Sequence, residues 1–159
     1  MIAASAGSIY HKVIFMKTLI RRYDVGVSES DTMDGWQVHS IKYIEMAYNT
    51  ERRKRIEKTD GYGKRTGVCG DTIEVFLMIK DDFIHKIYYD TDGCINTNAC
   101  CNALIHFVEN RDIYRAWKIT PEKIIKYLQT LPPENHHCAE LAAGSLYLAL
   151  SDYEKKRKK

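Results

Sequence analysis

The run Thr72-Ile-Glu-Val-Phe-Leu-Met-Ile-Lys80 is followed by Asp81-Asp82 and then by Phe83-Ile-His-Lys-Ile-Tyr-Tyr-Asp90, and this arrangement is the strongest indication of how the chain folds. Both long runs are rich in β-branched and aromatic residues, which favour strands. The second run alternates roughly between two faces, with Ile84, Lys86 and Tyr88 on one and His85, Ile87 and Tyr89 on the other. Two such runs joined by a short acidic turn predict an antiparallel β-hairpin.

Helical patterns dominate the chain after this hairpin. From about residue 96, apolar residues recur at i, i+4, i+7 and i+8, the spacing of one buried helix face. They are Cys100, Leu104, Phe107 and Val108. Thr120-Pro121-Glu122 predicts the start of a second helix, because a hydroxyl residue precedes a proline at the first helical position. A last helix is predicted to begin near His137 or Cys138.

Two segments precede the hairpin. A helix is predicted to begin near Gln37 or His39, with one face formed by Ile41, Ile44, Ala47 and Tyr48. The glycines at positions 61, 63, 67 and 70 then indicate a flexible or tightly turned segment. We therefore expect an α+β fold in which a small antiparallel β-sheet of about three strands carries helices on one face. Residues 1–35 are expected to form an N-terminal extension, and residues 36–159 a domain with a basic C-terminal tail.

The composition is that of an ordinary globular protein. Hydrophobic residues make up 45% of the 159 residues, and the formal net charge is only +3. Much of the positive charge lies in Glu154–Lys159, which we interpret as a solubilising tail, so no nucleic-acid binding is expected. The five cysteines are odd in number and lack the density of a secreted disulfide framework. They predict reduced thiols in a cytoplasmic protein.

The sequence predicts no membrane segment, since no apolar run reaches the roughly 18 residues that a spanning helix needs. Residues 1–22 contain no acidic residue and several basic ones, a composition compatible with an organelle transit peptide. The alternatives are an ordinary extension or translation from Met16 or Met33. We favour these alternatives, because basic amphipathic N-termini arise readily by chance.

Three cysteines stand at predicted chain reversals: Cys69 before the first strand, Cys94 after the second, and Cys138 at the start of the last helix. Asp71 and His137 lie beside them. Thiolates combined with a carboxylate or an imidazole suit zinc or an iron–sulfur cluster. A position at a helix N-terminus is expected to lower the pKa of Cys138. On spacing alone the alternative stays open, because free cysteines are often small buried hydrophobic residues.

From Tyr43 to Tyr153 the chain resembles the IscU/NifU N-terminal iron–sulfur cluster assembly scaffolds. The resemblance rests on several local motifs in the same order. They are Gly67-Val-Cys69-Gly-Asp71 before a strand, Thr91-Asp-Gly-Cys94 with Ala99 and Cys100 on the following helix, Leu131-Pro-Pro133 shortly before His137-Cys138, and Ala149-Leu-Ser-Asp-Tyr153.

The resemblance implies a non-enzymatic scaffold that assembles a transient 2Fe-2S cluster and transfers it to apoproteins. It implies Cys69, Cys94 and Cys138 as cluster ligands, Asp71 as an exchangeable carboxylate, and His137 as an alternative fourth ligand. Sulfur is expected as persulfide from a cysteine desulfurase, with Cys138 the first candidate acceptor and Cys69 the second. An iron donor or regulator is a further expected partner. Zinc is expected to occupy the same ligands in the absence of iron.

Two departures from the family pattern bear on partners and ligands. Leu131, Pro132 and Pro133, the implied partner-binding residues, are followed by Glu134-Asn135 instead of Val-Lys, which puts recognition by an Hsp70-type chaperone in doubt. His136 precedes the His-Cys pair as a spare ligand or, more simply, as a loop residue exposed to solvent. Cys100 and Cys101 are expected to pack in the core.

Two other functions compete with the cluster scaffold. One is a zinc-bound sulfur acceptor of the same fold that stimulates a cysteine desulfurase. Its relatives have an insertion between the second and third cysteines and no histidine at position 137, so the pattern here favours the scaffold. The other is a structural zinc domain. Asp71 argues against that function, because structural zinc sites use cysteine and histidine.

Overall fold

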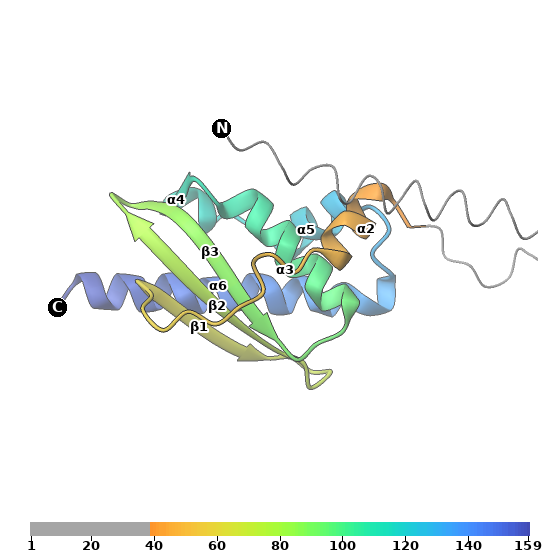
Figure 1. The fold of residues 1–159 in the computed structure, drawn as a ribbon, viewed down its shortest axis with the longest axis horizontal. Coiled ribbons are helices and arrows are strands. Elements are labelled where there is room, and N and C mark those ends of the chain that lie inside the picture. Colours follow the sequence, from red (N-terminus) through yellow and green to blue (C-terminus); the bar gives the residue numbers. More distant parts are fainter. Residues whose placement is uncertain (1–38) are drawn as a thin grey trace, which may run out of the picture. The chain divides into compact units, whose positions relative to one another are not determined.

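The computed structural model describes residues 39–159, in which an antiparallel sheet of order β1-β2-β3-β4 is covered by helices (Figure 1). The strands β2 (Thr72–Lys80) and β3 (Phe83–Thr91) form the predicted hairpin, which is confirmed. Strand β1 (Gly61–Thr66) pairs with the other edge of β2, and the short β4 (Arg111–Asp112) pairs with β3. The α+β class is confirmed.

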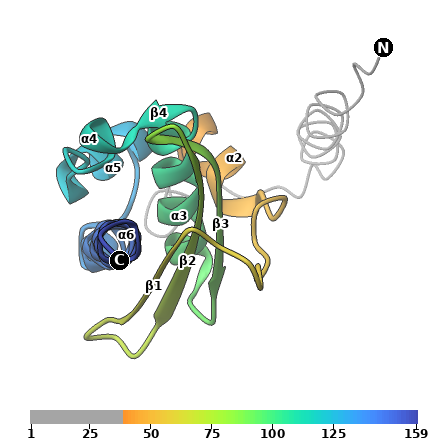
Figure 2. The same ribbon diagram turned by 90° about the vertical axis from the view of Figure 1, so that its left-hand side faces the viewer.

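The helices of the described part are α2 (Ile41–Tyr48), α3 (Ile95–Val108), α4 (Ile113–Ala116), α5 (Pro121–Leu128) and α6 (His136–Arg157), with a 3-10 turn η1 at Pro133–Asn135. Helix α6 runs along the sheet behind β1 and β2 in Figure 1, and Figure 2 views it nearly along its axis. The predicted stripe on α3 is confirmed, since Cys100, Leu104 and Val108 are buried. None of the described helices is both long and apolar enough to cross a membrane.

Strand β1 corrects the expectation of a flexible segment, and its glycines explain the error. A Cβ atom on Gly61 would lie 2.5 Å from the carbonyl oxygen of Ala149, and one on Gly63 would lie 2.3 Å from that of Ser145. The glycines therefore let the backbone of α6 approach the sheet directly. Glycine in this strand marks close packing against a helix rather than a turn.

A β-bulge corrects the predicted alternation of β3. Met78 pairs with Lys86 but Ile79 pairs with Ile84, so β3 carries one extra residue, His85, relative to β2. An extra residue changes which face the following side chains occupy. Ile84 therefore shares the buried face with Ile87 and Tyr89, while Lys86 is exposed.

The predicted apolar face of α2 is only partly confirmed, because Ala47 is buried but Ile41, Ile44 and Tyr48 are exposed, and the other buried residue is Tyr43. Hydrogen bonds from side chains of α3 determine how α2 is oriented. The amide of Asn98 donates to the carbonyl of Ala47 at 2.8 Å, and the amide of Asn102 donates to that of Met46 at 2.8 Å. These bonds satisfy carbonyls at the C-terminal end of α2 that have no partner within the helix.

The basic C-terminal residues extend helix α6 as far as Arg157, and Lys158 and Lys159 follow it. Arg157 lies in the last turn of α6 and forms an ion pair with Asp82 in the β2–β3 turn at 2.5 Å. Lys156 pairs with Asp152 one turn earlier at 2.7 Å. The predicted extension 1–35, its boundary at residue 36 and the predicted transit-like segment lie outside the described residues.

Candidate metal centre

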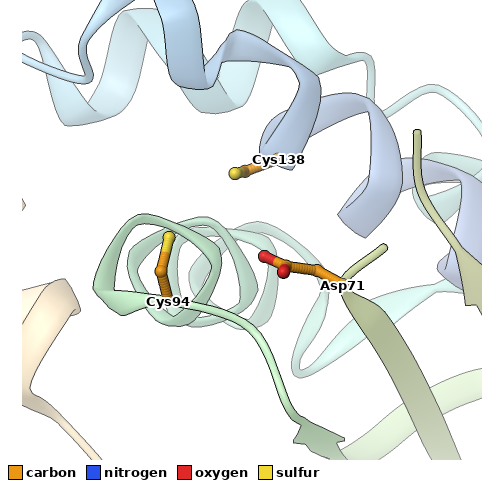
Figure 3. A group of neighbouring side chains, drawn as sticks. All are labelled: Asp71, Cys94 and Cys138. Atoms are coloured by element: carbon orange, nitrogen blue, oxygen red, sulfur yellow. The ribbon is translucent and has the colours of Figure 1, made fainter. Parts of the chain in front are cut away.

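Asp71, Cys94 and Cys138 meet at one end of the sheet (Figure 3). One ligand atom from each, a carboxylate oxygen and two sulfurs, lies within 4.8 Å of the others. Asp71 immediately precedes β2, Cys94 is the N-cap of α3 just beyond β3, and Cys138 lies in the first turn of α6. The antiparallel hairpin brings the start of β2 beside the end of β3, and the close approach of α6 adds the third residue.

A small hydrogen-bonded turn fixes Cys94 relative to Asp71. The Asp92 carboxylate accepts from the backbone N–H of Thr72 at 2.6 Å. The Thr91 hydroxyl donates to the Thr72 carbonyl at 2.7 Å and accepts from the N–H of Gly93 at 3.0 Å. These bonds tie the end of β3 to the start of β2, so that α3 begins at a defined position.

His137 presents one ring nitrogen to this site. Its Nδ1 lies 2.8 Å from the carbonyl oxygen of Glu134, which can only accept, so Nδ1 carries the proton. Its Nε2 is then unprotonated in the neutral ring and lies 3.6 Å from the sulfur of Cys138. An imidazole whose Nδ1 donates to a backbone carbonyl can bind a metal through Nε2.

Cys69 lies apart from the compact group formed by Asp71, Cys94 and Cys138. It is exposed on the turn between β1 and β2, which is closed by bonds from the N–H of Gly67 to the Asp71 carbonyl and from the N–H of Gly70 to the Gly67 carbonyl. Gly70 has φ of 89°, a conformation that glycine adopts readily. The turn therefore presents an accessible thiol two residues from a ligand candidate that is fixed at the start of β2.

Sequence reasoning missed Thr97, which is fully buried in the first turn of α3. Its hydroxyl oxygen lies 2.9 Å from Asp71 Oδ2, 3.4 Å from the sulfur of Cys138 and 3.7 Å from that of Cys94. The available signal was its position three residues after the N-cap Cys94, where a helical side chain lies close to the capping residue.

The cysteines of the compact group differ in acidity. Partial burial opposes ionisation of Cys94, but hydrogen bonds from the backbone and side chains of Thr97 and Asn96 lower its pKa below the ordinary value. Burial raises the pKa of Cys138 to about 11, and the charges of Cys94, Cys69 and Asp71 contribute despite the opposing bond from Thr97. The expectation that its helix position lowers the pKa of Cys138 is therefore wrong for the metal-free site.

The remaining candidate residues are placed as follows. Leu131 and Pro132 are buried beneath η1, whereas Pro133 and Glu134 are exposed. His136 is half-buried. Cys100 and Cys101 are buried in the core, as predicted, and burial raises the pKa of each thiol.

Residues 40–159 match the family described as NifU-like N terminal domain. The chain is 32% identical over 123 residues to "Iron-sulfur cluster assembly scaffold protein IscU 1" of Archaeoglobus fulgidus, covering 77% of this chain and 80% of the relative. It is 29% identical over 118 residues to "Iron-sulfur cluster assembly scaffold protein IscU" of Aquifex aeolicus, covering 72% and 75%.

Two crystal structures share the fold. A NifU-like protein (N-terminal) from Brucella abortus has a TM-score of 0.62 at 15% identity, covering 74% of this chain and 94% of that one. A putative scaffold protein for the SUF system from Fervidobacterium islandicum has a TM-score of 0.59 at 16% identity, covering 70% and 95%. At these identities the likeness concerns the fold alone.

Proposed function

Because the chain belongs to the NifU-like N-terminal domain family, we propose that it is a scaffold that assembles a 2Fe-2S cluster and passes it to apoproteins. The observation that carries the proposal is the convergence of Asp71, Cys94 and Cys138 within 4.8 Å, with His137 Nε2 beside them. Thiolates are the usual protein ligands of such clusters. The scaffold acts as a carrier, and the cluster is its cargo.

The ligand set suits a cluster that has to be released. Cys69, Cys94 and Cys138 supply thiolates, and Asp71 supplies a carboxylate oxygen. A hard oxygen ligand is a poorer match for iron–sulfide chemistry than a fourth thiolate, so the Asp71 position is the one at which exchange begins. His137 offers a further ligand on the Cys138 side, where its Nε2 lies 3.6 Å from the sulfur. Because the turn that carries Cys69 is exposed, we expect this thiol to be able to approach or leave the compact group of Asp71, Cys94 and Cys138.

Sulfur is proposed to arrive as persulfide from a cysteine desulfurase. Its terminal sulfur atom transfers to a scaffold thiolate, and the donor cysteine leaves as thiolate. Cys69 and Cys94 are both exposed, but Cys69 stands on a turn apart from the other ligand candidates, which supports its reacting first. Cys138 is enclosed and its pKa is raised to about 11, so we place it second, as the receiver of sulfur from Cys69. This reverses the order expected from the sequence.

Partner contacts are proposed at the same end of the molecule. Apoproteins that accept clusters and an iron donor or regulator need access to the turn that carries Cys69. In the Leu131-Pro132-Pro133 segment only Pro133 is exposed, so this residue and Glu134 would contact a partner. The exposed acid at 134 supports the doubt about an Hsp70-type chaperone. We propose a cytoplasmic location.

A zinc-bound sulfur acceptor that stimulates a cysteine desulfurase is the second candidate. The observation that favours it is the compactness of the ligand group, since three atoms within 4.8 Å suit a single ion. Two thiolates, a carboxylate and either Cys69 or His137 would complete four-coordinate zinc. The two candidates use the same residues and differ in whether a cluster is built and passed on.

Anaerobic reconstitution with iron, cysteine and a desulfurase tests the two candidates. The scaffold is expected to develop cluster absorbance, to contain iron and sulfide in equal amounts, and to activate an apo-ferredoxin. Cys94→Ser should abolish these properties, whereas Cys101→Ala, which removes a buried thiol outside the ligand set, should keep them. A colourless protein that holds one tight zinc and activates no ferredoxin would contradict the scaffold function.

A further inference from the structure

The hydroxyl of Thr97 is shared among the ligand candidates. It lies 2.9 Å from Asp71 Oδ2, 3.4 Å from Cys138 Sγ and 3.7 Å from Cys94 Sγ. Within residues 39–159, no other side chain is in hydrogen-bond contact with all three. A threonine hydroxyl is a weak ligand for iron or zinc, so its position among these residues calls for a different explanation.

The hydroxyl has a single proton, and Asp71 is the acceptor that best retains it. An ionised carboxylate is a stronger acceptor than a thiol, and the contact with Asp71 is the shortest of the three. The contact with Cys94 is the longest of the three, at 3.7 Å, and the thiol can itself be the donor in it. The hydroxyl proton is therefore free to hold one oxygen of Asp71.

The contact is rigid on the Thr97 side. The residue is fully buried in a helical turn, and β-branching restricts its χ1 rotation. Space for the contact depends on Gly93. A Cβ atom at Gly93 would lie 2.7 Å from Asp71 Oδ2 and 2.8 Å from the Thr97 Cβ and Cγ2 atoms. The absence of a side chain at 93 therefore lets the carboxylate and the hydroxyl meet.

We propose that Thr97 is a positioning residue, which holds the Asp71 carboxylate toward Cys94 and Cys138 and so sets how strongly the Asp71 position binds metal. Asp71 is half-buried at the end of a turn, and Figure 3 shows its carboxylate directed into the space between the two cysteines. Hydrogen bonds to a ligating carboxylate orient it, and their loss typically weakens metal binding by about 10–100-fold. The inference rests on the proposed function only in taking Asp71 as a ligand.

Cobalt(II) binding to the full chain tests the proposal without any cluster assembly. Affinity is measured by competition with a chelator, and the near-ultraviolet sulfur-to-cobalt absorption reports the thiolates. Thr97→Val, which keeps the side-chain shape, is expected to weaken binding about tenfold while keeping that absorption. Thr97→Ser, which keeps the hydroxyl, should stay within about twofold of the parent. Thermal melts show whether each variant is folded.

The Asp71→Ala background distinguishes an effect of the Thr97 hydroxyl on Asp71 from an effect of the Thr97 side chain on packing. In this background Thr97→Val should produce no further loss, because the residue on which the hydroxyl acts is absent. Gly93→Ala provides a second route, since its methyl group pushes Asp71 and Thr97 apart without substituting either residue. Gly93→Ala should weaken cobalt binding to a similar extent as Thr97→Val, so the proposal stays testable even if Thr97→Val folds poorly.

Three results would overturn the proposal. One is parental affinity in folded Thr97→Val. Another is a loss of the same size with and without Asp71, which would assign the effect to packing or to the thiols. The third is a parent chain that binds no cobalt, and this result would also remove the ligand set on which the proposed function depends. The first two leave the scaffold function intact, so the failures are distinguishable.

Discussion

Replacing Gly63 with alanine should loosen the packing of α6 on the sheet. The new Cβ would lie 2.3 Å from the Ser145 carbonyl oxygen and 2.5 Å from the Ala149 nitrogen, where ordinary contact begins at 3.4 Å. Both are backbone atoms, so α6 would have to move by about 1 Å (3.4 minus 2.3). Overpacking of this kind costs about 1–3 kcal/mol.

The net effect of Gly63→Ala on stability is smaller than the steric term. Alanine reduces the entropy of the unfolded chain, which returns about 0.4–1 kcal/mol. A loss of about 1–2 kcal/mol in the free energy of unfolding remains, or roughly 2–8 °C in melting temperature for a chain of this size. Urea denaturation and thermal melts followed by circular dichroism measure both quantities.

Gly67→Ala is the matched control. Its Cβ would meet the flexible Leu141 side chain at 3.2 Å rather than a backbone atom, so it should be close to neutral. Cobalt binding should also weaken in Gly63→Ala, because displacement of α6 carries Cys138 away from Asp71 and Cys94. Equal stability of the two variants would refute the argument that β1 is built for direct contact with the backbone of α6.

Three further predictions concern the site and its support. Asp71→Ala should lengthen the lifetime of the reconstituted cluster, since the exchangeable oxygen is lost and His137 can complete the set; faster decay of the absorbance would count against that role. The metal-free protein should lose stability as pH rises from about 9 to about 11. Unfolded Cys138 loses its proton near its ordinary pKa of 9.0, whereas the folded state keeps it until about 11. Melts across this range should show the fall, and a Cys138→Ala variant with an equally steep fall would exclude this thiol as a cause. Asn102→Ala should cost about 1–3 kcal/mol in urea denaturation, because carbonyls of α2 lose their donor, and a change below about 0.5 kcal/mol would contradict this.

The hairpin and the later helices could be predicted because their signals are local. Runs of β-branched and aromatic residues joined by Asp81-Asp82 mark β2 and β3, and the stripe from Cys100 to Val108 marks α3. Strand β1 could not be predicted, since Gly61 and Gly63 are set by contact with α6, which lies far away in sequence. The exposed face of α2 was missed for the same reason, because Asn98 and Asn102 on another helix determine its orientation.

The candidate site was predictable as a set of residues but not as a chemical environment. Local motifs identified Cys69, Asp71, Cys94, His137 and Cys138 as candidates. The separation of Cys69 from the compact group depends on the turn around Gly70. The raised pKa of Cys138 depends on burial, which outweighs its position at a helix start. The only sequence signal for Thr97 is its position three residues after Cys94, and its contacts with Asp71 and Cys138 arise only where three elements meet.

Helix α6 also fixes the distance between the candidate metal centre and the C-terminal end of the helix. It runs from Cys138 at the metal centre to Arg157 beside the β2–β3 turn (Figure 1). At 1.5 Å per residue these positions are about 28 Å apart. A fluorescent dye attached at the last turn would therefore be far from the ligands and from Cys69, yet within range of energy transfer to a visible-light absorber. Its emission could report cluster loading and release continuously, in the presence of partner proteins that occupy the other end.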